Sequence, residues 1–69
     1  MKVFRMEFIW DHKLFTIVVR AKSRIQARQA LVKRIPGPIK ITLVKRDRNR
    51  EGGGLPSGAI DAKEILKHE

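Results

Sequence analysis

The sequence predicts a small α+β domain in which a three-stranded sheet is covered on one face by a single helix, in the order β-β-α-β. Residues 3–10 and 13–21 alternate apolar and polar side chains with the two-residue period of strands. Residues 24–34 instead place apolar side chains at helical spacing, and 39–46 return to alternation. This change of period indicates two strands, a helix and a third strand.

The first two strands are expected to form a hairpin. Asp11 and His12 lie between them, and both residue types are enriched at positive φ, which a two-residue turn requires. A one-residue slip would place the two apolar sets on opposite faces of the sheet, so the apolar pattern specifies the register. That register pairs Phe4 with Val19, Met6 with Ile17, Phe8 with Phe15, and Trp10 with Lys13.

The helix carries start and stop signals. Ser23 followed by Gln26 matches a capping box, and Pro36 requires the helix to end by about Arg34. Its small apolar stripe, suited to close packing on a sheet, comprises Ala27, Ala30 and Leu31.

Two further apolar residues of the helix, Ile25 and Val32, lie on the far side of Arg28. Two arrangements are open. Either the buried face is wide and Arg28 extends its guanidinium past it to solvent, which is the favoured reading, or the helix carries a second, partly exposed apolar strip.

The third strand is expected to pair parallel to one hairpin strand through a right-handed crossover, beside either edge of the hairpin. Alternation places Ile39, Ile41 and Leu43 toward the core. The outer face would then hold Val3, Arg5, Glu7, Ile9, Leu14, Thr16, Val18, Arg20, Lys40, Thr42, Val44 and Arg46.

This outer face has more aliphatic residues than a face exposed only to water should carry. It could be covered by the C-terminal segment, by a second copy of the chain, or by another partner. RNA-binding sheets usually turn aromatic residues outward, whereas Phe4, Phe8 and Phe15 are expected to point inward here. A base-stacking platform is therefore disfavoured.

After the body, which spans residues 1–46, we expect a flexible basic and glycine-rich arm over 47–58 and a short C-terminal helix over 59–69. Asp61 lies near the start of this helix, and the apolar residues of the helix do not form a continuous stripe. A helix this short is marginal in water unless it docks.

Composition argues against several functional classes. The chain of 69 residues has no cysteine, which removes disulfides and thiolate metal sites, and its two histidines lie apart in sequence. No catalytic, metal-binding or cofactor-binding residues are identified, so an enzyme is not expected. The segment "MKVFRMEF" lacks a signal-peptide core, and no apolar run could span a membrane, so a cytoplasmic protein without membrane contact is expected.

Charge is the strongest functional signal. The net charge is +9, with +11 on residues 1–50 and −2 on 51–69. Such a basic body suggests a polyanionic partner, DNA or RNA. The segment "KRDRNREGGG" at 45–54 resembles no motif but suits phosphate contact, because arginine can grip phosphate bidentately and glycines leave the backbone free. The alternative is a solvated loop in which Asp47 and Glu51 pair locally.

The leading interpretation is thus a small nucleic-acid-binding protein that acts mainly through phosphate contacts. The predicted contacts are Lys45, Arg46, Arg48 and Arg50, followed by Arg20, Arg24, Arg28 and Lys40.

The alternative interpretation is a protein-interaction module, an adaptor or inhibitor of the phage or mobile-element type. It would cover an acidic or nucleic-acid-binding surface of a larger protein or ribonucleoprotein complex. A homodimer is a further possibility for so small a chain. The apolar residues that would form the interface are Leu14, Val18, Ile25, Val32 and Val44.

Overall fold

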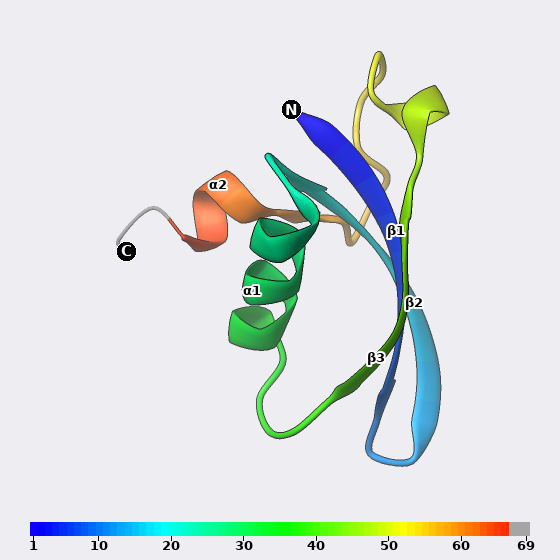
Figure 1. Ribbon diagram of the computed structural model, residues 1–69, viewed down its shortest axis with the longest axis vertical. Coiled ribbons are helices and arrows are strands. Elements are labelled where there is room, and N and C mark those ends of the chain that lie inside the picture. Colours follow the sequence, from blue (N-terminus) through cyan, green and yellow to red (C-terminus); the bar gives the residue numbers. More distant parts are fainter. Residues whose placement is uncertain (67–69) are drawn as a thin grey trace.

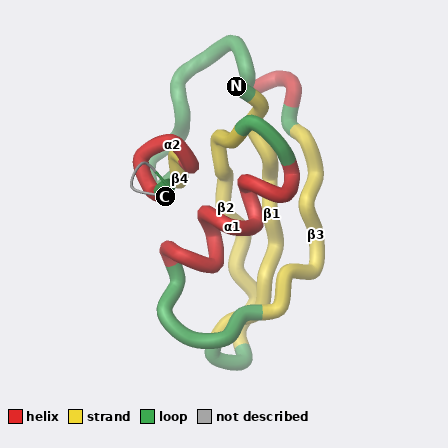
Figure 2. The backbone as a smooth tube through the Cα atoms, turned by 60° about the vertical axis from the view of Figure 1, so that its left-hand side comes forward, coloured by secondary structure: helices red, strands yellow, loops and turns green. Residues whose placement is uncertain are grey.

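The computed structural model describes residues 1–66 and has an α+β fold with a four-stranded mixed sheet in the order β3-β1-β2-β4 (Figure 1). Helix α1 crosses one face of the sheet, and the short helix α2 lies beside α1 rather than behind the sheet (Figures 1 and 2). The elements are β1 (Lys2–Trp10), β2 (Lys13–Ala21), α1 (Arg24–Arg34), β3 (Lys40–Arg46), a 3-10 helix (Arg48–Arg50), β4 (Ile60–Asp61) and α2 (Ala62–Ile65).

The predicted hairpin is confirmed in its turn and its register. Asp11 and His12 have φ values of 53° and 61°. The antiparallel pairing runs without interruption from Trp10 opposite Lys13 to Lys2 opposite Ala21. Positive φ at both turn residues gives the backbone twist that joins two antiparallel strands most directly.

The predicted helix is confirmed as well. The Ser23 hydroxyl accepts a hydrogen bond from the Gln26 backbone N–H at 3.2 Å, as an N-cap should. The returning bond differs from the usual capping box, because the Gln26 side-chain oxygen accepts from Lys22 N–H at 2.7 Å and not from Ser23. At the other end, the Ile35 N–H donates to the Leu31 carbonyl.

The core lies between the sheet and the small-residue stripe of α1. Ala27, Ala30 and Leu31 are fully buried there. Ile25 and Val32, by contrast, are 70% and 56% exposed. The prediction of a wide buried face on α1 is therefore wrong. The helix contacts the sheet along its alanines, and among the described residues nothing covers the second strip.

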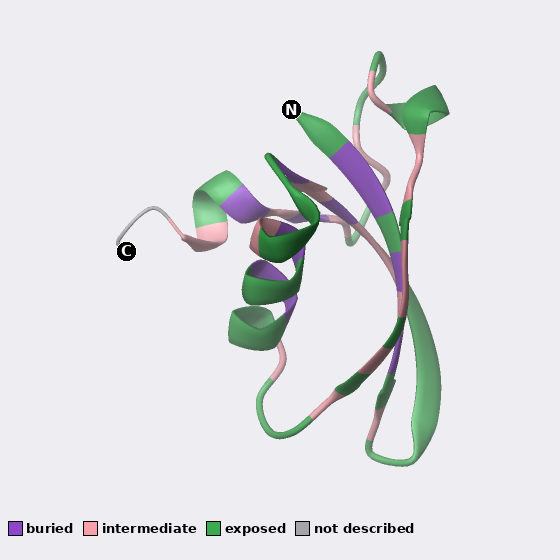
Figure 3. Cartoon of the chain, viewed as in Figure 1, coloured by how far each residue is buried: buried purple, intermediate pink, exposed green. Residues whose placement is uncertain are grey.

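The hairpin extends past the end of α1, so its tip has little cover (Figure 3). Phe15 stacks on Phe8 with ring centroids 5.5 Å apart and remains 36% exposed. Trp10 packs against Phe15 and donates its indole N–H to the Pro36 carbonyl at 2.9 Å. This bond ties the hairpin to the loop that follows α1.

The predicted direction of β3 relative to its neighbour is wrong. β3 pairs with β1, and it does so antiparallel. A helix that follows β2 returns the chain to the start of β2, so β3 runs in the same direction as β2. Since β1 lies between them and runs the opposite way, both contacts of β1 are antiparallel.

The sheet has a fourth strand that the sequence analysis did not predict. β4 pairs parallel to β2, with Ile60 opposite Val19 and Asp61 opposite Arg20. Ile60 and Ala62 are buried, and they anchor the segment that leads into α2. A strand of two residues has no detectable period, so only its partner defines it.

The C-terminal helix is shorter than expected and lies in a different place. Within the described part it spans Ala62–Ile65, and the Asp61 carboxylate caps it by accepting from the Lys63 N–H at 3.1 Å. Residues 67–69 of the predicted helix lie outside the described residues. α2 contacts α1 and β2, so it does not cover the opposite face of the sheet. No helix within residues 1–66 has the length and apolar character needed to cross a membrane.

Candidate nucleic-acid interface

A β-bulge in β3 decides which side chains reach the outer face, meaning the face of the sheet away from α1. Phe8 lies opposite Ile41 and Glu7 opposite Leu43, which leaves Thr42 as the extra residue. The Thr42 hydroxyl donates a hydrogen bond to the Glu7 carbonyl at 3.2 Å. The bulge therefore shifts the alternation of β3 by one residue.

The residues after the bulge consequently exchange faces. Val44 packs against the core, and Arg46 lies opposite the buried Phe4, so both are on the side of α1. Leu43 and Lys45 take the outer face instead. The predicted faces of Leu43, Val44 and Arg46 are thus wrong, because simple alternation carries no sign of an extra residue.

The shift sets two cations side by side. Lys45 lies directly opposite Arg5 on neighbouring strands, and both side chains are exposed. Like charges in this relation destabilise a sheet. Within residues 1–66, neither side chain forms an ion pair or hydrogen bond that would offset the repulsion.

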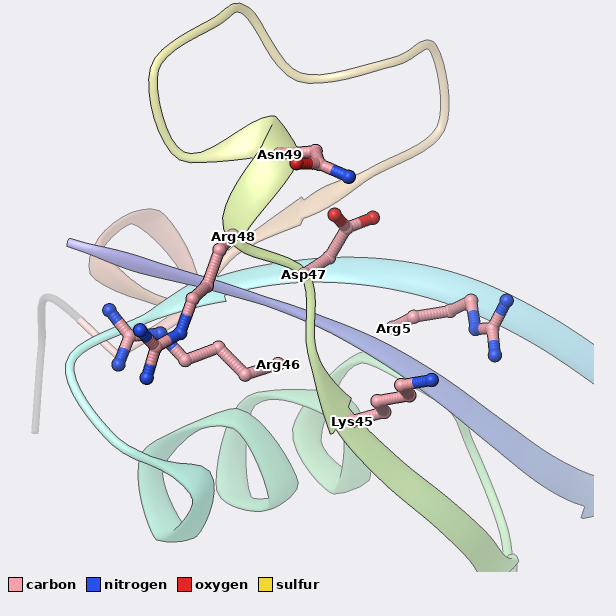
Figure 4. Close-up of a pocket in the computed structure, with 6 residues that line it drawn as sticks. All are labelled: Arg5, Lys45, Arg46, Asp47, Arg48 and Asn49. Carbon is pink, nitrogen blue, oxygen red and sulfur yellow. The ribbon is translucent and has the colours of Figure 1, made fainter.

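A third cation, Arg48, projects from the 3-10 helix that follows β3 and likewise lacks an ion-pair partner among the described residues. Figure 4 shows its guanidinium beside that of Arg46 on one side of β3, whereas Lys45 and Arg5 extend toward the other side. We call Arg5, Lys45 and Arg48 the basic cluster, in which Arg5 and Lys45 form a pair on one side of β3 and Arg48 lies on the other side. A surface cavity of about 370 Å³ adjoins it and is lined by Arg5, Lys45, Arg46, Asp47, Arg48 and Asn49.

Arg46 is not a free cation. Its Nε and Nη2 donate to the two carboxylate oxygens of Glu51 at 2.7 and 2.8 Å. This bidentate bond lowers the pKa of Glu51 from 4.5 to about 2, with a smaller contribution from the Arg48 charge, and it raises the pKa of Arg46. The pair joins the end of β3 to the start of the glycine-rich segment.

Arg50 is held in a similar way, with its Nε 3.2 Å from an oxygen of Asp47. Asp47 in turn donates its backbone N–H to the Val3 carbonyl at 2.8 Å. For Asp47 and Glu51, the local pairing that was the alternative to a free arm is the arrangement observed. Of the four predicted arm cations, Lys45 and Arg48 therefore remain unpaired.

Two of the second-rank residues have structural partners. The Arg24 guanidinium donates to the Val44 carbonyl and lies over the Phe4 ring at 5.9 Å, which fastens α1 to β3. Arg20 forms an ion pair with Asp61 at the far edge of the sheet. Its Nε is buried without a partner.

The other two second-rank residues are exposed but distant from the cluster. Arg28 lies on the outward side of α1, and Lys40 begins β3 opposite Ile9, toward the hairpin tip. The structure thus brings together only part of the predicted set. Sequence reasoning missed Arg5 and Asn49 as members of the site. The outward position of Arg5 followed from strand alternation, but its proximity to Lys45 depended on the bulge.

The residues proposed for a protein interface are also divided. Leu14 is 63% exposed, and Ile25 and Val32 are exposed on α1. Val18 is half-buried, and Val44 is partly buried against the core instead of lying on the outer face.

In residues 1–66, no group of three or more histidine, cysteine or acidic side chains is arranged to hold a metal ion. Comparison of the chain with protein-family models, with curated proteins and with solved structures found no match.

Proposed function

We propose that this protein binds nucleic acid through phosphate contacts made by the basic cluster of Arg5, Lys45 and Arg48. The observation that carries the proposal is the direct opposition of Arg5 and Lys45, neither of which forms an ion pair with a carboxylate within residues 1–66. An unpaired like-charge pair costs stability, and a bound phosphate between the two side chains would convert that repulsion into two attractions.

Two features of the surroundings favour this site over the rest of the basic surface. The neighbouring arginines are already neutralised, Arg46 by Glu51 and Arg50 by Asp47, so they orient the segment rather than compete for the ligand. The cavity also includes Asn49, whose amide can donate a hydrogen bond to a phosphate oxygen.

The test is a salt titration of binding, measured by fluorescence anisotropy with a labelled DNA duplex of about 20 base pairs, the matching RNA duplex and a single strand. With one phosphate shared by Arg5 and Lys45 and another at Arg48, two neutralised phosphates give a log–log slope of about −1.8 on duplex DNA and about −1.4 on a single strand. A slope near zero with every ligand would refute phosphate binding.

A matched pair of variants distinguishes the effect of the basic cluster on binding from the effect of net charge. Arg48→Gln removes a cluster cation, and Arg28→Gln removes another exposed cation, on α1. We expect Arg48→Gln to weaken binding and to reduce the steepness of the log–log slope by about 0.9. The affinity and slope of Arg28→Gln should stay close to those of the wild type. Equal losses in both variants would mean that the whole basic surface acts without a defined site.

A second candidate, the protein-interaction module, is favoured by one observation. Ile25 and Val32 form an exposed apolar strip along α1 with no described element over it. A partner retained after nuclease treatment, and lost on Ile25→Lys substitution, would support this function. Loss of all partners with nuclease would argue against it.

A further inference from the structure

The two edges of the sheet differ in how they are protected against pairing with another strand. Free strand edges attract other strands, and proteins commonly protect them with bulges and charged side chains. β3 has both kinds of protection, since it carries the Thr42 bulge and two lysines, and Arg24 occupies its Val44 carbonyl. Along β2, β4 pairs only from Val19 onward.

The remaining stretch of the β2 edge, residues 13–18, has neither a bulge nor a row of charges, and residues 56–59 lie beside its Thr16–Val18 end. Its sequence is "KLFTIV", with one charge at its end, no proline and no register shift in its pairing with β1. β-Branched and aromatic residues, which are enriched in strands, dominate it.

The hairpin geometry shows which backbone groups of this stretch are unpaired. Trp10 and Lys13 close a two-residue turn, so they form a hydrogen-bonded pair, and the alternation that follows directs the odd-numbered residues of β2 to β1. The N–H and C=O groups of Leu14 and Thr16 therefore point away from β1, toward the free edge. Those of Val18 point the same way, but its C=O faces Ile60 of β4. Side chains on either side of the edge are apolar and open to solvent, with Leu14 63% and Phe15 36% exposed.

We propose that a second copy of this chain pairs with this edge, strand β2 antiparallel to strand β2, about a two-fold axis at Phe15. Self-pairing must place outward-pointing residues opposite each other, which permits centres at Leu14, Phe15 or Thr16. A centre at Thr16 sets Lys13 of the second copy opposite Val19, a position that Ile60 already occupies. A centre at Leu14 shortens the shared strand.

The register centred at Phe15 also places apolar side chains of the two copies in contact. Phe15 faces its own symmetry mate, so the stacked pair of Phe8 and Phe15 extends into a row of four rings across the axis. On the outer face, Leu14 of the second copy lies opposite Thr16. A cavity of about 310 Å³ adjoins that position. Its lining comprises Thr16, Ile17, Val18, residues 56–59, and the charged residues Arg5, Asp47 and Arg50.

Charge placement permits this association despite the net charge of +9 on each copy. Lys45 and Arg48 lie at the β3 end of the sheet, Arg5 lies on β1 opposite Val18, and the β2 stretch carries only Lys13. In two copies joined through β2, one continuous sheet runs β3-β1-β2-β2-β1-β3, and Lys45 and Arg48 lie toward its two outer edges. Repulsion between them falls off over about 10 Å at 0.1 M salt.

Disulfide cross-linking tests the register directly, because the chain has no native cysteine. Residues opposite each other in a non-hydrogen-bonded pair have Cα atoms about 4.5 Å apart, within the range of a disulfide. Phe15→Cys is therefore expected to form a covalent dimer rapidly under mild oxidation of dilute protein. Thr16→Cys, which faces Leu14 of the second copy, and Val32→Cys on α1 are expected to cross-link at least tenfold more slowly. Equal rates for the three variants would overturn the register.

Replacing Phe15 also disturbs the aromatic contacts with Phe8 and Trp10, so a second measurement keeps Phe15 in place. Sedimentation equilibrium of the wild-type chain should show a monomer–dimer equilibrium that strengthens with salt, whereas phosphate binding weakens with salt. Leu14→Lys should make the chain monomeric and Val32→Lys should not, since both residues are exposed in the monomer. A wild-type chain that is monomeric at every concentration and salt would refute the dimer and leave the proposed phosphate site unaffected.

Discussion

Replacing Lys45 by glutamate should raise the stability of this protein while it weakens nucleic-acid binding. Lys45→Glu turns the like-charge pair with Arg5 into an opposite-charge pair on the exposed face of the sheet. The basic cluster drops from three cations to two and gains a negative charge. Stability and binding are therefore expected to change in opposite directions, as they do where a site is strained for function.

The magnitude follows from the exposure of both side chains. Cross-strand charge pairs contribute about 0.2–1 kcal/mol, and solvent screening keeps exposed pairs within that range, so we take about 0.5 kcal/mol. For a domain of this size, that corresponds to a rise in Tm of about 2–4 °C. Thermal unfolding followed by circular dichroism at low salt measures it, and about 0.5 M NaCl should remove most of the gain.

The control is Arg28→Glu, which makes the same change in net charge on the exposed side of α1, away from Arg5. If relief of general repulsion were the cause, both variants would gain equally. Equal Tm values for Lys45→Glu and Arg28→Glu, or a loss of stability in Lys45→Glu, would refute the paired geometry of Arg5 and Lys45. Unchanged nucleic-acid binding by Lys45→Glu would refute the role of the cluster.

Three further predictions concern the fold. Because the pKa of Glu51 is lowered, its ion pair stabilises the protein above pH 4.5, and this contribution is lost as the pH falls from 4.5 toward about 2. In Glu51→Gln, the free energy of unfolding measured with urea should therefore depend less on pH over this range. Trp10→Phe removes the bond to the Pro36 carbonyl and should cost about 0.5–1.5 kcal/mol, measured by urea denaturation. Leu31→Ala should cost about 2–5 kcal/mol because the side chain is fully buried, whereas Val32→Ala should change stability little; similar losses in both would contradict the observed orientation of α1.

The candidate site was only partly predictable from the sequence. Net charge and the run of cations at 45–50 indicated a polyanion site near the end of β3, and Lys45 and Arg48 remain in it. The pairing of Arg46 with Glu51 depended on the path of the chain after β3. The contribution of Arg5 depended on one extra residue in the strand, which no local pattern announces.

The sequence by itself determined the hairpin with its register and the bounds of α1. Both follow from interactions between residues close in the chain: the two-residue turn at Asp11 and His12, and the Ser23 cap. Only the tertiary structure decided the antiparallel placement of β3, the bulge, the parallel strand β4 and the position of α2 beside α1. These depend on contacts between segments that lie far apart in the chain. The same apolar pattern is compatible with several arrangements of these segments, and the arrangement that buries the apolar side chains of all of them together is the most stable.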